Sequence, residues 1–181
     1  GYAKTFLRQL ETSLGTALDR GVKIVANAGG LNPAGLAGAV RSLAERLGVD
    51  AKIAHVEGDD LRSRAGELGF GDPLAANAYL GAWGIAECLN AGADVVVTGR
   101  VTDASLVLGP AAAHFGWART SYDELAGAVV AGHVIECGTQ ATGGNYAFFG
   151  EITDLRHAGF PIAEVHADGS SVITKDPGTG G

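Results

Sequence analysis

Hydrophobic residues recur along the chain with two different spacings, and these predict helices alternating with strands. Apolar residues three or four positions apart indicate helices over 6–18, 36–47, 80–89 and 125–134. Shorter helices are expected at 61–68 and after Asp103, where Pro110 would restart the helix. Runs of apolar residues predict strands at 22–26, 51–56 and 94–97.

The run from Asp94 to Val97 is apolar on both faces apart from its first residue, as in the middle strand of a parallel sheet. Three strands joined by helices give a right-handed β-α-β-α-β order, so their carboxyl ends should share one edge. The tail differs, because strands at 162–165 and 171–174 flank Asp168-Gly169, a hairpin signal. We predict an α/β fold with a mostly parallel sheet, helices in Rossmann-like layers and a short β-hairpin near the C-terminus. A partial (β/α) barrel is the alternative, because strand-helix units look the same locally.

Composition suits a single α/β domain over residues 1–181. Hydrophobic residues make up 46% and charged residues 18% of the 181 residues, enough for a sizeable core. The net charge of −7 argues against nucleic acid as a partner, because basic patches supply that affinity. No apolar run approaches the ~20 residues of a membrane helix, and no secretory leader is visible, so no membrane partner is expected. Only two cysteines occur, which indicates a reducing, cytoplasmic location.

Ligands of open α/β sheets bind just past the carboxyl ends of the strands, and polar residues gather at three such places. The first is 27–35, where glycines can turn backbone amides toward a ligand and a helix start favours an anion. Its spacing matches neither the dinucleotide fingerprint nor the phosphate-binding loop with its lysine. The alternative is a glycine-rich turn capped by Asn32. The candidate substrate-binding residues are Asn27, Gly29, Gly30 and Asn32.

The second place is the acidic cluster Glu57, Asp59 and Asp60. Three carboxylates could hold a hard cation such as Mg²⁺, or a substrate hydroxyl. Equally, Asp59 or Asp60 could cap the helix that follows. Asp59 is taken as a candidate catalytic residue, and no metal ligand is assigned.

The third place combines Thr98, Arg100, Thr102 and Asp103. Arginine offers a planar fork that suits a carboxylate or phosphate. Asp103 could orient Arg100, act as a base or bind a metal, or the two could form an internal pair that only fixes the loop. Thr98 and Arg100 are candidate substrate-binding residues, and Asp103 is a candidate catalytic residue.

His133, Glu136 and Cys137 lie three and four positions apart near a helix end. Side chains four apart on one helix point outward in parallel, whereas catalytic Cys–His pairs usually come from separate elements. We therefore expect His133 and Cys137 to be structural. The Gly/Thr/Asn loop that follows adds Asn145 as a candidate substrate-binding residue.

Six long stretches of the chain resemble the acyclic terpene utilisation family, AtuA, a bacterial and fungal family formerly described as a domain of unknown function. They are Val25 to Pro33, His55 to Asp60, Ala76 to Gly81, Val97 to Ser105, Glu136 to Tyr146 and Gly169 to Lys175. Together they cover essentially the whole chain. Members of the family are longer, so the resemblance implies an internal piece of a longer protein.

The resemblance implies a role in the catabolism of acyclic terpenes such as citronellol and geraniol, which proceeds through acyl-CoA intermediates. We expect an enzyme or enzyme subunit that acts on a small acid or its acyl-CoA ester. The alternative is a non-catalytic module that binds an anion or assembles a complex. The expected partners are an anionic small molecule and either further copies or the remainder of the longer chain, and no cofactor is assigned.

Overall fold

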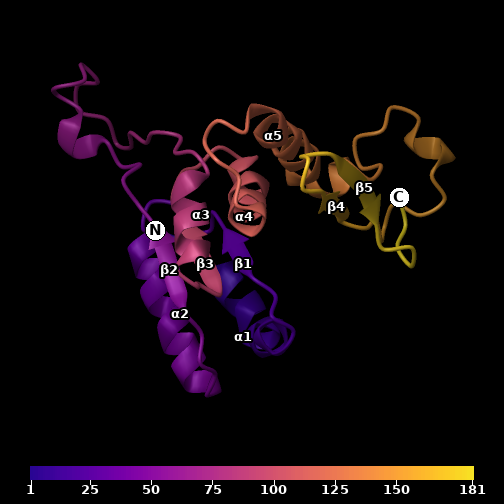
Figure 1. The fold of residues 1–181 in the computed structure, drawn as a ribbon, viewed down its shortest axis with the longest axis horizontal. Coiled ribbons are helices and arrows are strands. Elements are labelled where there is room, and N and C mark those ends of the chain that lie inside the picture. Colours follow the sequence, from indigo (N-terminus) through magenta and orange to yellow (C-terminus); the bar gives the residue numbers. More distant parts are fainter. The chain divides into compact units, whose positions relative to one another are not determined.

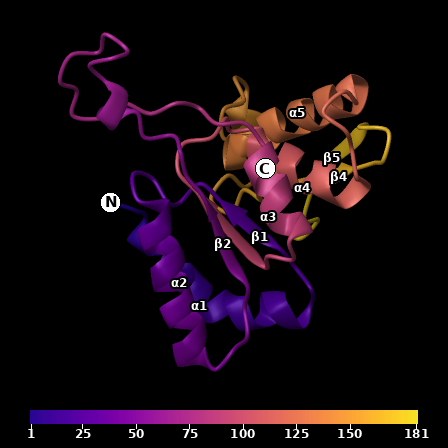
Figure 2. The same cartoon turned by 60° about the vertical axis from the view of Figure 1, so that its left-hand side comes forward.

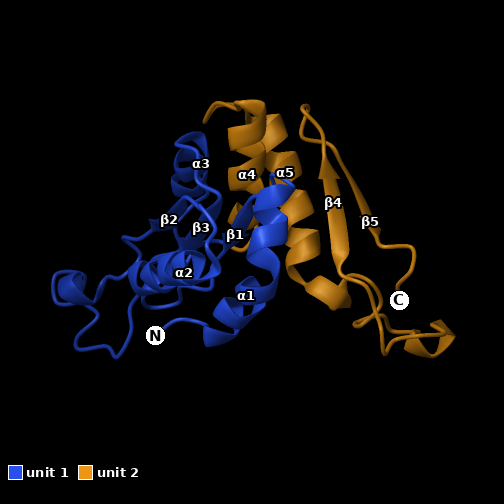
Figure 3. Ribbon diagram, turned by 90° about the horizontal axis from the view of Figure 1, so that it is seen from below, with its two compact units in different colours: residues 1–102 blue, residues 103–181 orange.

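The computed structural model describes residues 1–181, which form two compact units, 1–102 and 103–181 (Figure 3). The first unit holds a three-stranded parallel sheet with helices around it, and the second holds two helices and an antiparallel hairpin. The sheet is open and does not close into a barrel. The predicted α/β class and the C-terminal hairpin are therefore confirmed.

Three strands make the sheet of the first unit, in the spatial order β1-β3-β2. The elements are α1 (Lys4–Asp19), β1 (Ile24–Ala26), α2 (Pro33–Leu47), β2 (Ile53–Val56), α3 (Trp83–Asn90) and β3 (Val95–Thr98). In the register, Val97 of β3 lies beside Ala26 of β1 and His55 of β2. Because all three strands are parallel, their carboxyl ends open on one edge, as predicted.

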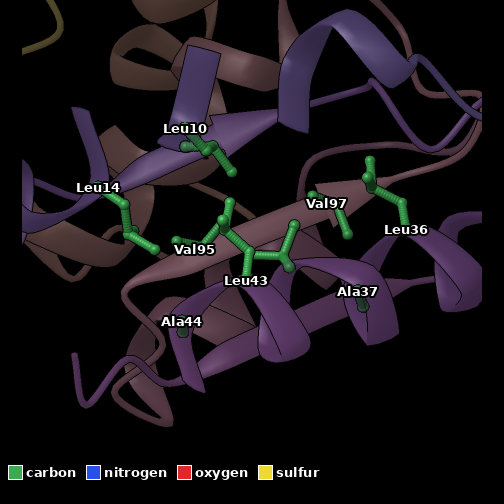
Figure 4. Packing of buried hydrophobic residues seen from close by; sticks show 9 residues of the cluster. Leu10, Leu14, Leu36, Ala37, Leu43, Ala44, Val95 and Val97 are labelled. Atoms are coloured by element: carbon green, nitrogen blue, oxygen red, sulfur yellow. The ribbon is translucent and has the colours of Figure 1, made fainter. Parts of the chain in front are cut away.

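The core of the first unit lies between the sheet and the pair α1 and α2 (Figure 4). Val95 and Val97 of β3 form one cluster with Leu10 and Leu14 of α1 and Leu43 of α2, and all five are almost fully buried. Alternate strand residues face opposite sides of a sheet. The other side is covered by α3, which packs on β2 and β3.

Asp94 joins the three strands at their amino ends. Its carboxylate accepts hydrogen bonds from the Lys23 ammonium (2.8 Å) and from the backbone N–H of Lys52 (2.9 Å). Its own N–H donates to the Lys52 carbonyl, and its carbonyl accepts from the N–H of Ile24. One residue ahead of β3 is thus bonded to the segments that lead into β1 and β2.

Residues 61–76 form an arm that extends away from the sheet (Figures 1 and 2). The helix predicted at 61–68 is wrong, because only the 3-10 turn Arg62–Arg64 is present. Gly69 and Gly71 have positive φ angles, which an α-helix does not contain, and the apolar side chains of Leu68, Phe70 and Leu74 are exposed. The arm closes at its base, where the N–H of Leu61 donates to the Ala76 carbonyl (2.7 Å).

The second unit contains α4 (Ser105–Phe115), α5 (Tyr122–Glu136), β4 (Pro161–Val165) and β5 (Ser171–Lys175), with 3-10 turns at Gly138–Gln140 and Phe149–Glu151. Helix α5 packs against α4 and against the hairpin. Two glycines allow this: a Cβ on Gly132 would lie 2.8 Å from the Ala104 backbone, and one on Gly127 would overlap the Gly169 carbonyl.

One expectation about this unit is corrected. Pro110 does not restart a helix but lies inside α4, which is continuous. Asp103 lies two residues ahead of α4, which begins after Ala104 without a side-chain cap. Across both units, none of the helices combines the length and the apolar character needed to cross a bilayer.

Candidate functional site

A cavity of about 170 Å³, the Arg100 cavity, lies where the loops after β1 and β3 meet. Its lining consists of Asn27, Gly30, Leu31, Asn77, Gly99 and Arg100. Three of these follow the carboxyl ends of strands, two precede α2, and Asn77 comes from the returning end of the arm. The cavity therefore occupies the sheet edge at which the sequence predicts a ligand site.

The backbone of Arg100 is fixed from both sides. Its N–H donates to the Asp59 carboxylate (2.8 Å), and its carbonyl accepts a hydrogen bond from the N–H of Leu80 (3.1 Å). The guanidinium lies over the ring of Tyr79, with 5.2 Å from its central carbon to the ring centre. Within residues 1–102 no carboxylate pairs with this guanidinium. A rigidly placed cation is therefore available to an anion at the cavity.

Asp59 connects two segments of the site through hydrogen bonds to its carboxylate. Its side chain is only 3% exposed, and one carboxylate oxygen, Oδ2, accepts from both the Asn77 amide (2.9 Å) and the Arg100 N–H (2.8 Å). This close approach depends on Gly99, since a Cβ there would lie 2.6 Å from Asp59 Oδ1. Asp59 thus connects the arm to the loop after β3, which is a positioning role.

In the glycine-rich loop at 27–35, some residues line the cavity and others hold the loop in its conformation. Asn27 and Gly30 line the cavity, and the Asn27 amide is exposed and has no hydrogen-bond partner. The N–H of Gly29 donates to the Thr98 carbonyl (3.0 Å), which ties the loop to β3. Asn32 caps α2, where its side chain accepts a hydrogen bond from the N–H of Gly35 (2.9 Å).

Thr98 is fully buried at the end of β3, and its hydroxyl donates to the Gly99 carbonyl (3.1 Å). The side chain therefore shapes the turn that leads to Arg100. It is absent from the cavity lining.

The other acidic residues of the second cluster have local partners. The Asp60 carboxylate accepts bonds from the Arg62 guanidinium, as short as 2.6 Å, and these lower the pKa of Asp60 to about 2. Glu57 lies 3.4 Å from the His55 ring. No group of three or more histidine, cysteine, aspartate or glutamate side chains is placed to hold a metal ion.

Asp103 and Asn145 belong to the second unit, and the predicted catalytic role of Asp103 and substrate-binding role of Asn145 stay predictions. Asp103 is exposed just ahead of α4. Asn145 lines a cavity of about 710 Å³ within that unit, together with Gln140, Thr142, Tyr146 and Lys175 among others.

Cys137 follows the last residue of α5, and its thiol donates to the Glu136 carboxylate (3.3 Å). This hydrogen bond, with the nearby negative charges of Glu136 and Asp103, raises the pKa of the Cys137 thiol. A raised pKa reduces the thiolate fraction, and the thiolate is the nucleophile. The arrangement supports the structural interpretation of His133 and Cys137.

Sequence patterns did not single out Leu31, Asn77 and Tyr79. Asn77 and Tyr79 lie in an irregular segment without helix or strand periodicity, and Leu31 reads as an ordinary loop residue. The only sequence signal near the arm was the stretch Ala76 to Gly81, one of those that resemble the AtuA family. Asn77 and Tyr79 lie near Arg100 because the arm folds back to its base.

Comparisons with known proteins give one result. The model of the acyclic terpene utilisation family protein AtuA matches residues 1–181, which confirms the predicted family. No curated protein and no solved structure matches the chain. The match extends over both units and includes every residue of the Arg100 cavity. The chain therefore belongs to the acyclic terpene utilisation family, AtuA.

Proposed function

We propose that the first unit binds the anionic group of a small acid, or of its acyl-CoA ester, with Arg100 as the residue that holds the anion. The family links the chain to the utilisation of acyclic terpenes. The observation that carries the proposal is that Arg100 lines a cavity, with a fixed backbone and a guanidinium that has no carboxylate partner in its unit. An unpaired, oriented arginine fork suits a carboxylate or a phosphate.

Two asparagines support the same chemistry. The Asn27 amide is unpaired, and the Asn77 amide uses one N–H on Asp59, so donors and acceptors remain for the ligand. Neutral amides add hydrogen bonds without adding charge. They would orient the anion, while Arg100 supplies most of the attraction.

Two versions of this function differ in whether the ligand is turned over. In the enzymatic version, Asp103 acts as the base, and Asp59 acts through Arg100 as a positioning residue. In the second version the unit is a binding module of a larger assembly. The second has a specific observation in its favour, because the cavity lining contains no general acid or base among its six residues.

The test is isothermal titration of the protein and of its Arg100→Lys variant with citronellate and citronellyl-CoA. Lysine keeps the charge and loses the fork, so a bidentate contact predicts an affinity loss of about 1.5–3 kcal/mol. Arg46→Lys is the matched control, because Arg46 pairs with Glu11 on exposed helix surfaces. Unchanged affinity in the Arg100 variant would refute the proposal.

Turnover separates the two versions. If Asp103 is a base, Asp103→Asn abolishes activity toward the bound ligand and leaves its dissociation constant unchanged. If the unit is a binding module, the unaltered protein binds the ligand without converting it.

A further inference from the structure

We infer that the ligand of the Arg100 cavity is a free carboxylic acid with an apolar chain, and not a CoA ester. The inference rests on the proposed function and narrows its ligand class. Three features of the first unit lead to it: the size of the cavity, the charges around it and the side chains at its rim.

The cavity is small. Its volume is about 170 Å³, whereas pockets that enclose a whole ligand commonly measure about 300–1,000 Å³. A water molecule occupies about 30 Å³ in the liquid, so the cavity has room for a carboxylate and a few further atoms. The remainder of any larger ligand has to lie outside it.

The charges near the cavity favour a ligand with a single negative charge. Arg100 is the one cation in the lining. Two other arginines lie at the start of the arm that follows β2. Both already form ion pairs, Arg62 with Asp60 and Arg64 with Glu67. One guanidinium balances one carboxylate in a fork-to-fork pair.

A CoA ester has different requirements. It carries several phosphate charges, which would need further basic residues to neutralise them. At this edge of the first unit Asp59 is buried and Glu57 is exposed, and the exposed Lys4 follows Ala3, whose N–H donates to the Ala28 carbonyl. A polyanion that extends beyond Arg100 would therefore meet one further cation for several phosphate charges, with carboxylates nearby.

The rim is apolar where the chain of a carboxylic acid would leave the cavity. Leu31 belongs to the lining and is 54% exposed, and Tyr79 covers the Arg100 guanidinium and is 64% exposed. Covering these side chains with an aliphatic chain removes apolar surface from water, and each Å² of apolar surface that is covered favours binding by about 25 cal/mol. A long branched acid gains this contact, and acetate does not.

The experiment is titration calorimetry on the whole protein with four probes: citronellate, citronellyl-CoA, acetate and CoA. We expect citronellate to bind at least about tenfold more tightly than either acetate or the CoA ester, and CoA not to bind. A tenfold difference corresponds to about 1.4 kcal/mol. Arg100→Lys should weaken both citronellate and acetate.

Variants of the rim test the chain contact separately. Leu31→Ala and Tyr79→Ala should each weaken citronellate severalfold more than they weaken acetate, because only citronellate has a chain that covers these side chains, whereas Tyr79→Leu should retain most of the affinity. Tyr122→Ala, at a 72% exposed tyrosine of α5, is the matched control. Thermal melting of each variant shows that it is folded.

The outcomes separate the two proposals. If citronellyl-CoA binds more tightly than citronellate and Arg100→Lys weakens it, the free-acid inference is wrong and the proposed function stands. If neither citronellate nor its CoA ester responds to Arg100→Lys, the proposed function itself fails. Citronellate that binds no better than acetate would overturn the chain contact.

Discussion

At the scale of single residues, the site depends on a glycine that gives a carboxylate room. Gly99 is buried between the end of β3 and Arg100, and its missing side chain lets Asp59 reach the Arg100 N–H. The position of Arg100 is therefore set by Asp59, which lies 41 residues earlier in the chain. Arg100, which lines the cavity, and Asp59, which holds its backbone, therefore belong to different segments of the chain.

Gly99→Ala tests this dependence. Its Cβ would displace the buried Asp59 carboxylate, so we expect a loss of about 1–3 kcal/mol in the free energy of unfolding, and weaker binding of citronellate. Urea unfolding and calorimetry measure the two effects. Gly81→Ala is the control, because a Cβ there meets nothing within 4 Å. Equal stability of the two variants would show that Asp59 can move without cost.

The Cys137 thiol provides a second test at this scale. Because Glu136 holds the pKa of the thiol above its ordinary value, iodoacetamide should react with Cys137 more slowly than with an unstructured cysteine peptide near pH 8. Glu136→Gln should speed the reaction in a Cys88→Ser background. Fast alkylation of the unaltered protein would contradict the structural role and make Cys137 a candidate nucleophile.

At the scale of elements, Asp94 links β3 by hydrogen bonds to the segments that lead into β1 and β2. Asp94→Asn removes the charge that attracts Lys23, while the backbone partners remain, so we expect a loss of about 1 kcal/mol near pH 7. Bonds to Lys23 and Lys52 lower the pKa of Asp94 in the folded protein. Its contribution is therefore complete above the unfolded-state pKa and is lost as the pH falls through the folded-state pKa.

Urea unfolding near pH 7 and near pH 3 checks this dependence. The difference between the protein and Asp94→Asn should shrink on acidification, because Asp94 takes up its proton at a higher pH in the unfolded chain than in the folded protein. Asp50→Asn, at an exposed aspartate without a hydrogen-bonded partner, should show no such difference. A constant difference across this range would mean that the Lys23 pair contributes nothing to stability.

The elements that could be predicted from the sequence are those whose burial pattern is local. The run Val95 to Val97 is apolar on both faces because β3 is the central strand, and Asp168-Gly169 marks the hairpin turn. The arm at 61–76 could not be predicted, since bonds between irregular segments close it. The same contrast holds in the site: Asn27, Gly30 and Arg100 follow from strand ends, whereas Asn77 and Tyr79 depend on the return of the arm.

At the scale of the whole molecule, the chain consists of two compact units, 1–102 and 103–181. All nine buried residues of the main core, from Leu10 to Val97, belong to the first unit. The Arg100 cavity is lined by residues of the same unit. The first unit thus contains both a core and a candidate site, and the single domain expected over residues 1–181 stays a prediction.

Residues 1–102 expressed alone should therefore fold and retain Arg100-dependent binding of citronellate. We expect a cooperative urea transition, because the sheet, α1, α2 and α3 bury one another within this unit. Circular dichroism and calorimetry measure the result. A non-cooperative transition with exposed hydrophobic surface would favour the single-domain prediction and assign part of the stability to residues 103–181.

The closed base of the arm has a consequence for protein engineering. Asp60 and Asn77 form an antiparallel bridge, and the N–H of Ala78 donates to the Asp59 carbonyl (2.8 Å), so the two ends of the arm meet in a hairpin-like junction. Chain inserted at an exposed loop whose ends are already joined adds little closure entropy, about 0.6 kcal/mol per doubling of length. The middle of the arm near Gly69, where the chain is exposed, can then accept a peptide tag or a fluorescent reporter, which would signal ligand entry at Arg100 through Asn77.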